Sequence, residues 1–172
     1  MSSADTEKYA PQVATHRRTT SAILSTTKEL IARSGVSKIS MIEISDESEV
    51  SRATLYNHYR DKESVLRALA ESEFARLITV AQKGSTQQEI LQLLSQEIST
   101  DRALATMRTT DPGLLTQILT HQSDELWVSF LHSFSQLIPN QVLAATSLRW
   151  LIGQVFAPLT PEQSKIQSEA LS

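Results

Sequence analysis

The segment from Ile39 to Asp61 constrains the fold most strongly, because it contains two helix start signals in close succession. Ser40 can accept a hydrogen bond from the backbone N–H of Glu43 while the Glu43 side chain reaches back, which is the pattern of a capping box. Ser51 can cap a second helix over residues 52–57, in which polar side chains outnumber apolar ones. The segment therefore predicts two short helices joined by a tight turn.

The second of these helices is a poor core element, since Leu55 is its main inward anchor. Its remaining side chains are of types that suit phosphates and base edges: Arg52, Thr54, Tyr56 and Asn57. A short helix, a turn and a second short helix with a polar outer face is how many proteins place side chains in the DNA major groove. The alternative for these residues is ordinary capping and packing at a helix end.

The run from Val50 to Glu63, with the segment from Ile23 to Gly35, resembles the N-terminal domain of the TetR family of transcriptional regulators. The order Thr-Leu-Tyr-x-His-Tyr-x-x-Lys-Glu follows the family signature closely, and the resemblance covers about residues 20 to 66. One position departs from the family, which commonly has Gly in the turn before the Val, where this chain has Glu49. A non-Gly residue at positive φ costs on the order of 1 kcal/mol.

The resemblance implies a set of DNA-contacting residues. Thr54 and Tyr56 would contact base edges or phosphates, and His58 would hold the DNA backbone. Lys62 would bind a phosphate at the start of the fourth helix, whereas Tyr59 would pack inside. The full predicted set is Arg17, Arg18, Ser40, Met41, Ser51, Arg52, Thr54, Tyr56, Asn57, His58 and Lys62.

The net charge of −3 looks unfavourable for a DNA-binding protein, but the position of charge matters more than its sum. Residues 8–28 contain four basic side chains and no acid. Arg52, Arg60 and Lys62 outnumber Asp61 between residues 50 and 62. These groups can form a basic face if the nearby acids point away from it; the alternative is scattered solvated charge.

Composition excludes several classes of site. The chain has no cysteine, so disulfides, thiolate metal sites and a cysteine nucleophile are excluded. No apolar run approaches the roughly 20 residues that span a bilayer, and the polar N-terminus does not resemble a signal peptide. We therefore expect a cytoplasmic protein with no membrane association and no cofactor.

Helical periodicity runs through the whole chain of 172 residues, and no strand pattern or repeat competes with it. We predict an all-α fold with an N-terminal three-helix helix-turn-helix domain and a C-terminal helical bundle. The predicted divisions are a flexible arm over 1–18, a DNA-binding domain over 19–61, and a ligand-binding and dimerisation domain over 62–172. Predicted helices cover about 20–34 and 62–82, and further helices begin after Thr86, Asp101, Asp111, Ser123, Asn140 and Thr160.

The C-terminal region contains aromatic residues that could line a ligand pocket, although core packing explains each equally well. The candidates are Phe74, Trp127, Phe130 and Phe134. The helix over about 140–157 is apolar nearly all round, and the resemblance implies that the last two helices pair across a dimer. The predicted interface residues are Leu148, Leu151, Ile152 and Val155.

His121, Glu125 and His132 have a spacing that would place them roughly on one face of a continuous helix, where they could bind a metal ion. Ser123 indicates a helix break between them, so we assign no metal site. No nucleophile and base pair or phosphate loop supports an enzyme. The sequence therefore predicts a homodimeric DNA-binding transcriptional regulator, in the main a repressor of a palindromic operator controlled by a small molecule. The alternatives are control by a partner protein and a small helical enzyme.

Overall fold

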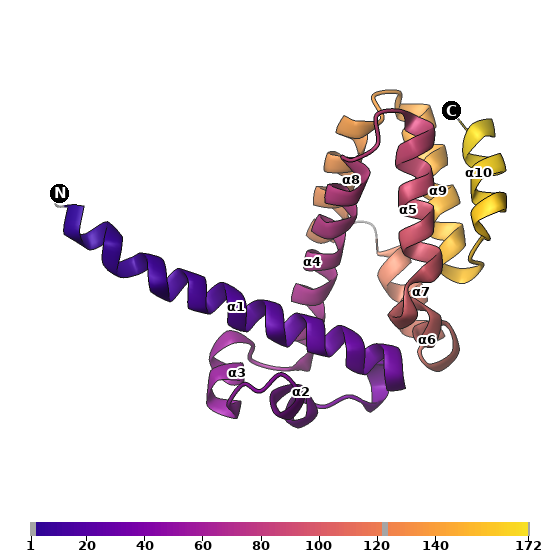
Figure 1. Cartoon of the computed structure of the whole chain (residues 1–172). Helices are drawn as coiled ribbons and strands as arrows, with labels where there is room; N and C mark the ends of the chain where they lie inside the picture. The colour runs from indigo at the N-terminus through magenta and orange to yellow at the C-terminus, as the bar shows by residue number, and fades with distance from the viewer. Residues whose placement is uncertain (1–2, 122–123, 172) are drawn as a thin grey trace.

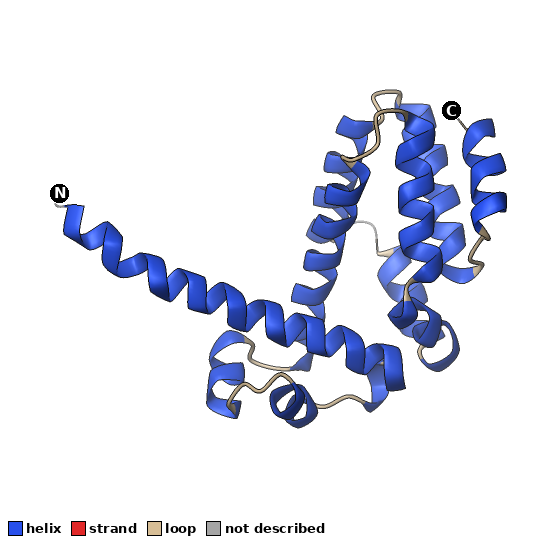
Figure 2. Cartoon of the chain, in the orientation of Figure 1, coloured by secondary structure: helices blue, strands red, loops and turns tan. Residues whose placement is uncertain are grey.

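The computed structural model describes residues 3–121 and 124–171, and within these ranges it contains α-helices, one 3-10 helix and no strand (Figure 2). The elements are α1 (Ser3–Ser34), the 3-10 helix η1 (Val36–Lys38), α2 (Met41–Glu47), α3 (Arg52–His58), α4 (Lys62–Ala81), α5 (Gln87–Thr100), α6 (Arg102–Thr110), α7 (Pro112–Thr120), α8 (Glu125–Leu137), α9 (Gln141–Phe156) and α10 (Pro161–Ala170). The predicted all-α fold is confirmed. No helix in the described part of the chain is long and apolar enough to cross a membrane.

Side-chain caps set most helix starts where the sequence predicts them. The capping side chains are Asp61 for α4, Thr86 for α5, Asp101 for α6, Asn140 for α9 and Thr160 for α10. Ser123, predicted to open a helix, lies outside the described residues, and Asp124 caps α8 by accepting a hydrogen bond from the Leu126 N–H. Each cap satisfies a backbone donor that the helix itself cannot use, which is why these residues mark helix starts so reliably.

The first helix is much longer than the sequence predicts. We expected an irregular arm over 1–18 and a helix from about residue 20, but α1 begins at Ser3. Extending an existing helix adds one hydrogen bond for each residue fixed, so polar residues can continue a helix without apolar periodicity. Figure 1 shows the first half of α1 running away from the rest of the molecule.

The N-terminal helices pack around three side chains with no exposed surface, Ile23 of α1, Ile44 of α2 and Leu55 of α3. The C-terminal helices have a continuous core that includes Leu91 and Leu94 of α5. Helix α1 packs against both α6 and α4, so the α1–α3 group is held by contacts from two sides of the bundle (Figure 1).

The four aromatic residues predicted to line a pocket lie together, but they pack against one another. Phe74 of α4 lies 5.0 Å from Trp127 and 4.9 Å from Phe130 between ring centroids, and Phe130 stacks on Phe134 at 6.0 Å. These contacts join α4 to α8. Phe134 also borders a hollow of about 400 Å³ between α8 and α9.

The predicted dimer residues require a correction. Leu148, Leu151 and Val155 are buried inside their own chain, with 9%, 3% and 6% of their surface exposed. Helix α9 packs against α5, and this contact needs an apolar face of its own. Only Ile152 of the four predicted residues is partly exposed. The outward apolar residues of the last three helices are instead Val128, Val142, Phe156 and Ile166.

Candidate nucleic-acid interface

The pair of helices α2 and α3 is fixed by short polar contacts. The Ser40 hydroxyl accepts the Glu43 N–H at 3.3 Å, and the Ser40 N–H donates to the Glu43 carboxylate at 2.9 Å, so the predicted capping box is present. Between the helices, the Ser45 hydroxyl donates to the Val50 carbonyl at 2.7 Å. Ser51 then caps α3 by accepting the Thr54 N–H at 3.1 Å. These bonds give the turn a single geometry.

Glu49 occupies the turn in the left-handed region, with φ of 56°. This is the position where the sequence departs from the TetR pattern and where Gly would be favoured. The turn therefore keeps the required conformation without glycine, at a conformational cost.

Helix α3 presents an outer face that has no partner within the chain. Arg52 and Asn57 are exposed, and Tyr56 exposes 53% of its surface. Within the part of the chain that the structure describes, these three side chains make no hydrogen bond or ion pair, while Leu55 on the opposite face is fully buried. Donors and an aromatic ring held outward on a capped helix are available to phosphates and base edges.

Two residues predicted to contact DNA are engaged inside the protein. The His58 ring stacks on His16 at 4.3 Å and its Nδ1 lies 3.4 Å from the Thr20 hydroxyl, so it faces α1. Burial lowers the pKa of His58, and the nearby His16 lowers it further. The Lys62 ammonium donates to the carbonyls of Val36 and Ile39 at 3.1 Å each. Lys62 therefore holds the turn before α2, besides any contact that its remaining donor makes.

The other residues predicted to contact DNA are exposed or partly exposed. Ser51 is exposed, Thr54 is partly exposed, and their hydroxyls bond each other at 2.8 Å. Ser40 and Met41 are partly exposed at the start of α2. Arg17 and Arg18 lie exposed on α1. Tyr59 packs against the core, as expected.

Charge near the helix pair is partly neutralised within the chain. Glu47 of α2 forms an exposed ion pair with Arg33 of α1, so the charge of one of the three acids near the turn is balanced by a basic side chain. Asp46 and Glu49 remain exposed. Lys38, in η1 directly before α2, is exposed and adds a positive charge that the predicted set omits.

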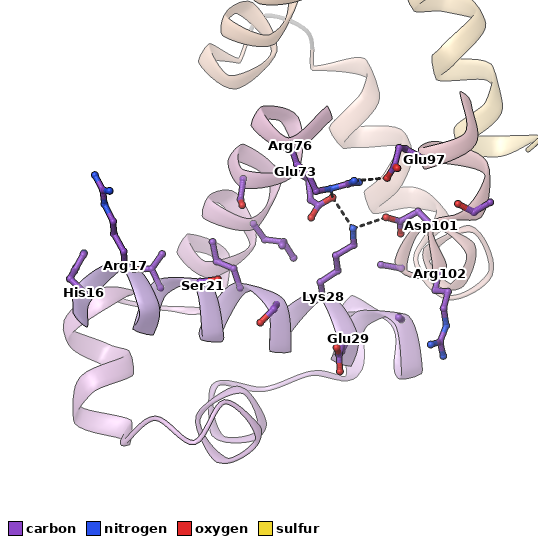
Figure 3. A pocket seen from close by; sticks show the side chains of 18 residues that line it. His16, Arg17, Ser21, Lys28, Glu29, Glu73, Arg76, Glu97, Asp101 and Arg102 are labelled. Carbon is purple, nitrogen blue, oxygen red and sulfur yellow. Dashed lines mark hydrogen bonds and ion pairs between the residues drawn. The ribbon is translucent and has the colours of Figure 1, made fainter. Parts of the chain in front are cut away.

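A chain of alternating charges joins α1 to the C-terminal helices (Figure 3). Lys28 of α1 pairs with Asp101 and with Glu73, each at 2.7 Å. Arg76 of α4 pairs with Glu73 at 2.9 Å and with Glu97 of α5 at 2.5 Å. Burial alone would lower the pKa of Lys28, but its hydrogen bonds to Asp101 and Glu73 and their charges raise it. These pairs border an open depression of about 900 Å³ along α1.

Asp111, at the start of α7, connects this helix to η1, and the sequence does not predict this contact. Its carboxylate accepts hydrogen bonds from the N–H groups of Val36, at 2.9 Å, and Ser37, at 3.0 Å. Burial would raise the pKa of Asp111, but hydrogen bonds from Ser37, Thr110 and the backbone of Val36 outweigh it and lower the pKa. The partners are 75 and 74 positions away, so no local pattern could identify them.

The histidines considered for metal binding do not form a site. Among residues 3–121 and 124–171, no group of three or more His, Asp or Glu side chains is placed to hold a metal ion. The His121 ring instead contacts the Gln117 carbonyl at 2.9 Å.

Residues 23–69, which include the capped helix pair and the exposed face of α3, match the sequence model of the family described as bacterial regulatory proteins, tetR family. This segment is therefore a tetR-type domain. The match ends at Leu69, within α4, so it covers the α2–α3 pair and the start of the connection to the C-terminal helices. No curated protein matches the chain in sequence.

Several solved structures of similar fold are of regulators that have little sequence identity to this chain. The fatty acid degradation regulator FadR from Bacillus halodurans is 16% identical, with a TM-score of 0.68 over 88% of this chain and 93% of that one. The TetR family repressor AlkX from Dietzia sp. strain DQ12-45-1b is 17% identical, with a TM-score of 0.63 over 87% and 93%. FadR from Bacillus subtilis, in complex with stearoyl-CoA, is 16% identical, with a TM-score of 0.55 over 87% and 94%.

Proposed function

We propose that this chain is a dimeric transcriptional regulator that binds a palindromic DNA operator through α2 and α3. The observation that carries the proposal is the unpartnered outer face of α3, Arg52, Tyr56 and Asn57, inside the segment that matches the tetR family. In this assignment α1–α3 bind DNA, and α4–α10 bind the effector and the second subunit. The helix-turn-helix places its second helix in the major groove, and a two-fold dimer requires a palindromic site.

The dimer surface that we propose lies on the outer faces of α8, α9 and α10. Val142 exposes 74% of its surface, and Val128, Phe156 and Ile166 expose 55%, 46% and 62%. Several large apolar side chains on neighbouring exposed faces favour a protein contact. The predicted Ile152 can join them at the edge, whereas Leu148, Leu151 and Val155 stabilise the single chain.

DNA binding is tested by selecting duplexes from a random library with the full chain and measuring affinity by fluorescence anisotropy over a range of salt concentrations. We expect Tyr56→Ala and Arg52→Ala each to weaken binding by about 1–3 kcal/mol if they contact bases. Arg102→Ala is the matched control, because Arg102 is also an exposed arginine but lies on α6, away from α3. If the wild-type chain enriches no duplex, the proposed function is wrong.

The effector that we propose is a hydrophobic or amphipathic small molecule. The hollow between α8 and α9 is lined mainly by apolar side chains, with Arg149 among its residues. The similar FadR from Bacillus subtilis is solved with stearoyl-CoA, a molecule with an apolar chain and a charged end. Binding here would shift α8 against α4 through the aromatic contacts of Phe74. A preference of only about 1.4 kcal/mol for a misplaced state changes DNA affinity tenfold.

We propose that the protein acts mainly as a repressor, because blocking a promoter needs only occupancy of the operator. We also propose that it lies in the cytoplasm, where its DNA is. The similar AlkX is described as a repressor. A partner protein in place of a small molecule is the second candidate for control, and it would use the same outward apolar residues of α8–α10. Co-purification with a protein, instead of a small molecule, would favour it. We assign the chain no catalytic role.

A further inference from the structure

Asp111 occupies a helix start without capping the helix. An Asp at this position ordinarily accepts a hydrogen bond from the second or third N–H of its own helix, an interaction worth about 1 kcal/mol. Asp111 precedes Pro112 at the start of α7, yet its side chain makes no such bond. The residue is 95% buried, with only 5% of its surface exposed, so its oxygens need partners elsewhere.

Those partners all belong to the turn before α2 or to the end of α6. Val36 and Ser37 of η1 donate their N–H groups to the two carboxylate oxygens, and the Ser37 hydroxyl donates as well. Thr110 donates its hydroxyl at 2.5 Å. The approach is close: Gly35 has φ of 83°, and a Cβ there would lie 2.6 Å from an Asp111 oxygen. The Asp111 side chain therefore bonds to η1 instead of capping its own helix, α7.

The same turn is held from its other side by Lys62. The ammonium of this α4 residue accepts no hydrogen bond and donates to the carbonyls of Val36 and Ile39. A carboxylate therefore binds two N–H groups of η1, while an ammonium binds one carbonyl of η1 and the carbonyl of the next residue after it. Because η1 leads directly to the Ser40 capping box, the position of the turn sets the direction of α2 and, through the Ser45–Val50 contact, of α3.

We propose that Asp111 is a positioning residue for DNA binding: its carboxylate fixes η1 and so sets the orientation of the α2–α3 pair relative to the C-terminal helices. This inference rests on the DNA-binding function proposed above and names a residue through which α7 controls it. Any effector that displaces the start of α7 would remove the Asp111 contacts to the turn and leave Lys62 of α4 to hold it alone. The contact is additional to the charge chain at Lys28, which joins different elements.

The test is Asp111→Asn, which keeps the size of the side chain but puts an NH2 group where one accepted N–H lies. Asp124→Asn is the matched control, because Asp124 is also an acidic residue at a helix start and also bonds to another element, by pairing with Arg67 of α4 at 3.0 Å. The chain has no cysteine, so Asp46→Cys on α2 and Gln117→Cys on α7 accept a single pair of spin labels. Their distance is measured by pulsed electron resonance in labelled chains diluted with unlabelled protein. Duplex affinity is measured on unlabelled protein.

We expect a narrow distance distribution for the wild type and for Asp124→Asn, and a broadened one for Asp111→Asn together with at least tenfold weaker binding of the selected duplex. An unchanged distribution, or an unchanged affinity, in Asp111→Asn overturns the proposal. If the wild type binds no duplex, the DNA-binding function fails, but the distances still decide whether Asp111 positions the helix pair.

If Asp111→Asn does not fold, Ser37→Ala removes one donor to the carboxylate from the opposite side. We then expect a smaller broadening and a smaller loss of affinity in the same direction. Ser25→Ala is its control, since the Ser25 hydroxyl bonds only within α1, to the Ala22 carbonyl at 3.1 Å. Equal behaviour of the two serine variants would overturn the proposal.

Discussion

Glu49 shows how a single residue can hold strain in the turn that joins α2 and α3. Its φ of 56° disfavours any side chain, and the side chain makes no compensating bond in the described structure. We expect Glu49→Gly to stabilise the protein by roughly 0.5–1 kcal/mol, because the relief of strain exceeds the entropy that glycine adds to the unfolded chain. Urea denaturation measures this change.

Glu49→Gln provides the control, since it removes the charge and keeps the strain. It should leave the free energy of unfolding nearly unchanged. If both variants are stabilised equally, charge repulsion with Asp46 and not the backbone is the cause.

Ser147 and Ser95 give a matched pair for buried hydroxyls. Both are fully buried, but the Ser147 hydroxyl has no hydrogen-bond partner among the residues that the structure describes, whereas the Ser95 hydroxyl donates to the Gln154 side chain at 2.5 Å. We expect Ser147→Ala to stabilise the chain by about 1 kcal/mol and Ser95→Ala to destabilise it by about as much. Thermal and urea unfolding of the two variants would show opposite shifts; shifts of the same sign would contradict this expectation.

At the scale of elements, helix starts are the part of the fold that sequence predicts best. The side chains of Ser40, Ser51 and Asp61 each accept a hydrogen bond from the N–H group three residues on. Their capping role can therefore be predicted from the local sequence. The start of α1 is different, because no apolar pattern distinguishes an arm from a helix that continues outward. Asp111 is the reverse case: it has the pattern of a cap, but tertiary contacts draw its side chain away.

The attachment of η1 should be sensitive to acid. The pKa of Asp111 is lower in the folded protein than its ordinary value, so the carboxylate stabilises the fold above the unfolded pKa of about 3.9, and this contribution is lost as pH falls through the folded pKa. We expect the stability difference between wild type and Asp111→Asn to be constant near neutral pH and to shrink below about pH 4. Urea denaturation across pH measures it. A difference that grows in acid would contradict the sign of the shift.

At the scale of the whole molecule, the outward apolar residues of α8–α10 favour a homodimer. We expect the purified chain to be dimeric in light scattering at micromolar concentration. Val142→Glu, on the exposed face of α9, should give a folded monomer. Leu151→Glu, on the buried face, should instead abolish cooperative unfolding, because it leaves an unpaired charge in the core. If the Val142→Glu variant remains dimeric, the dimer interface does not include this face of α9.

The sequence does not predict which apolar residues of α9 are buried and which are exposed. Leu148 and Val142 are both apolar, and only the packing of α9 against α5, α6 and α8 decides that the first is buried and the second exposed. The same limit applies to His58 and Lys62, whose DNA roles follow from motif position while their contacts with His16 and Val36 depend on the assembled fold. The match to the family model depends on the order of neighbouring residues in the chain, so the sequence alone is sufficient to detect it.

The bond between Ser37 and Asp111 also has a consequence in time. A ribosome makes the chain from its N-terminus, so Ser37 is made 74 positions before the carboxylate that it binds, and α2 and α3 are also complete before Asp111 is added. During that interval the N–H groups of η1 have no Asp111 to bind. A nascent or truncated chain that ends before α7 would therefore contain the α2–α3 pair with the turn before α2 bonded to Lys62 but not to Asp111.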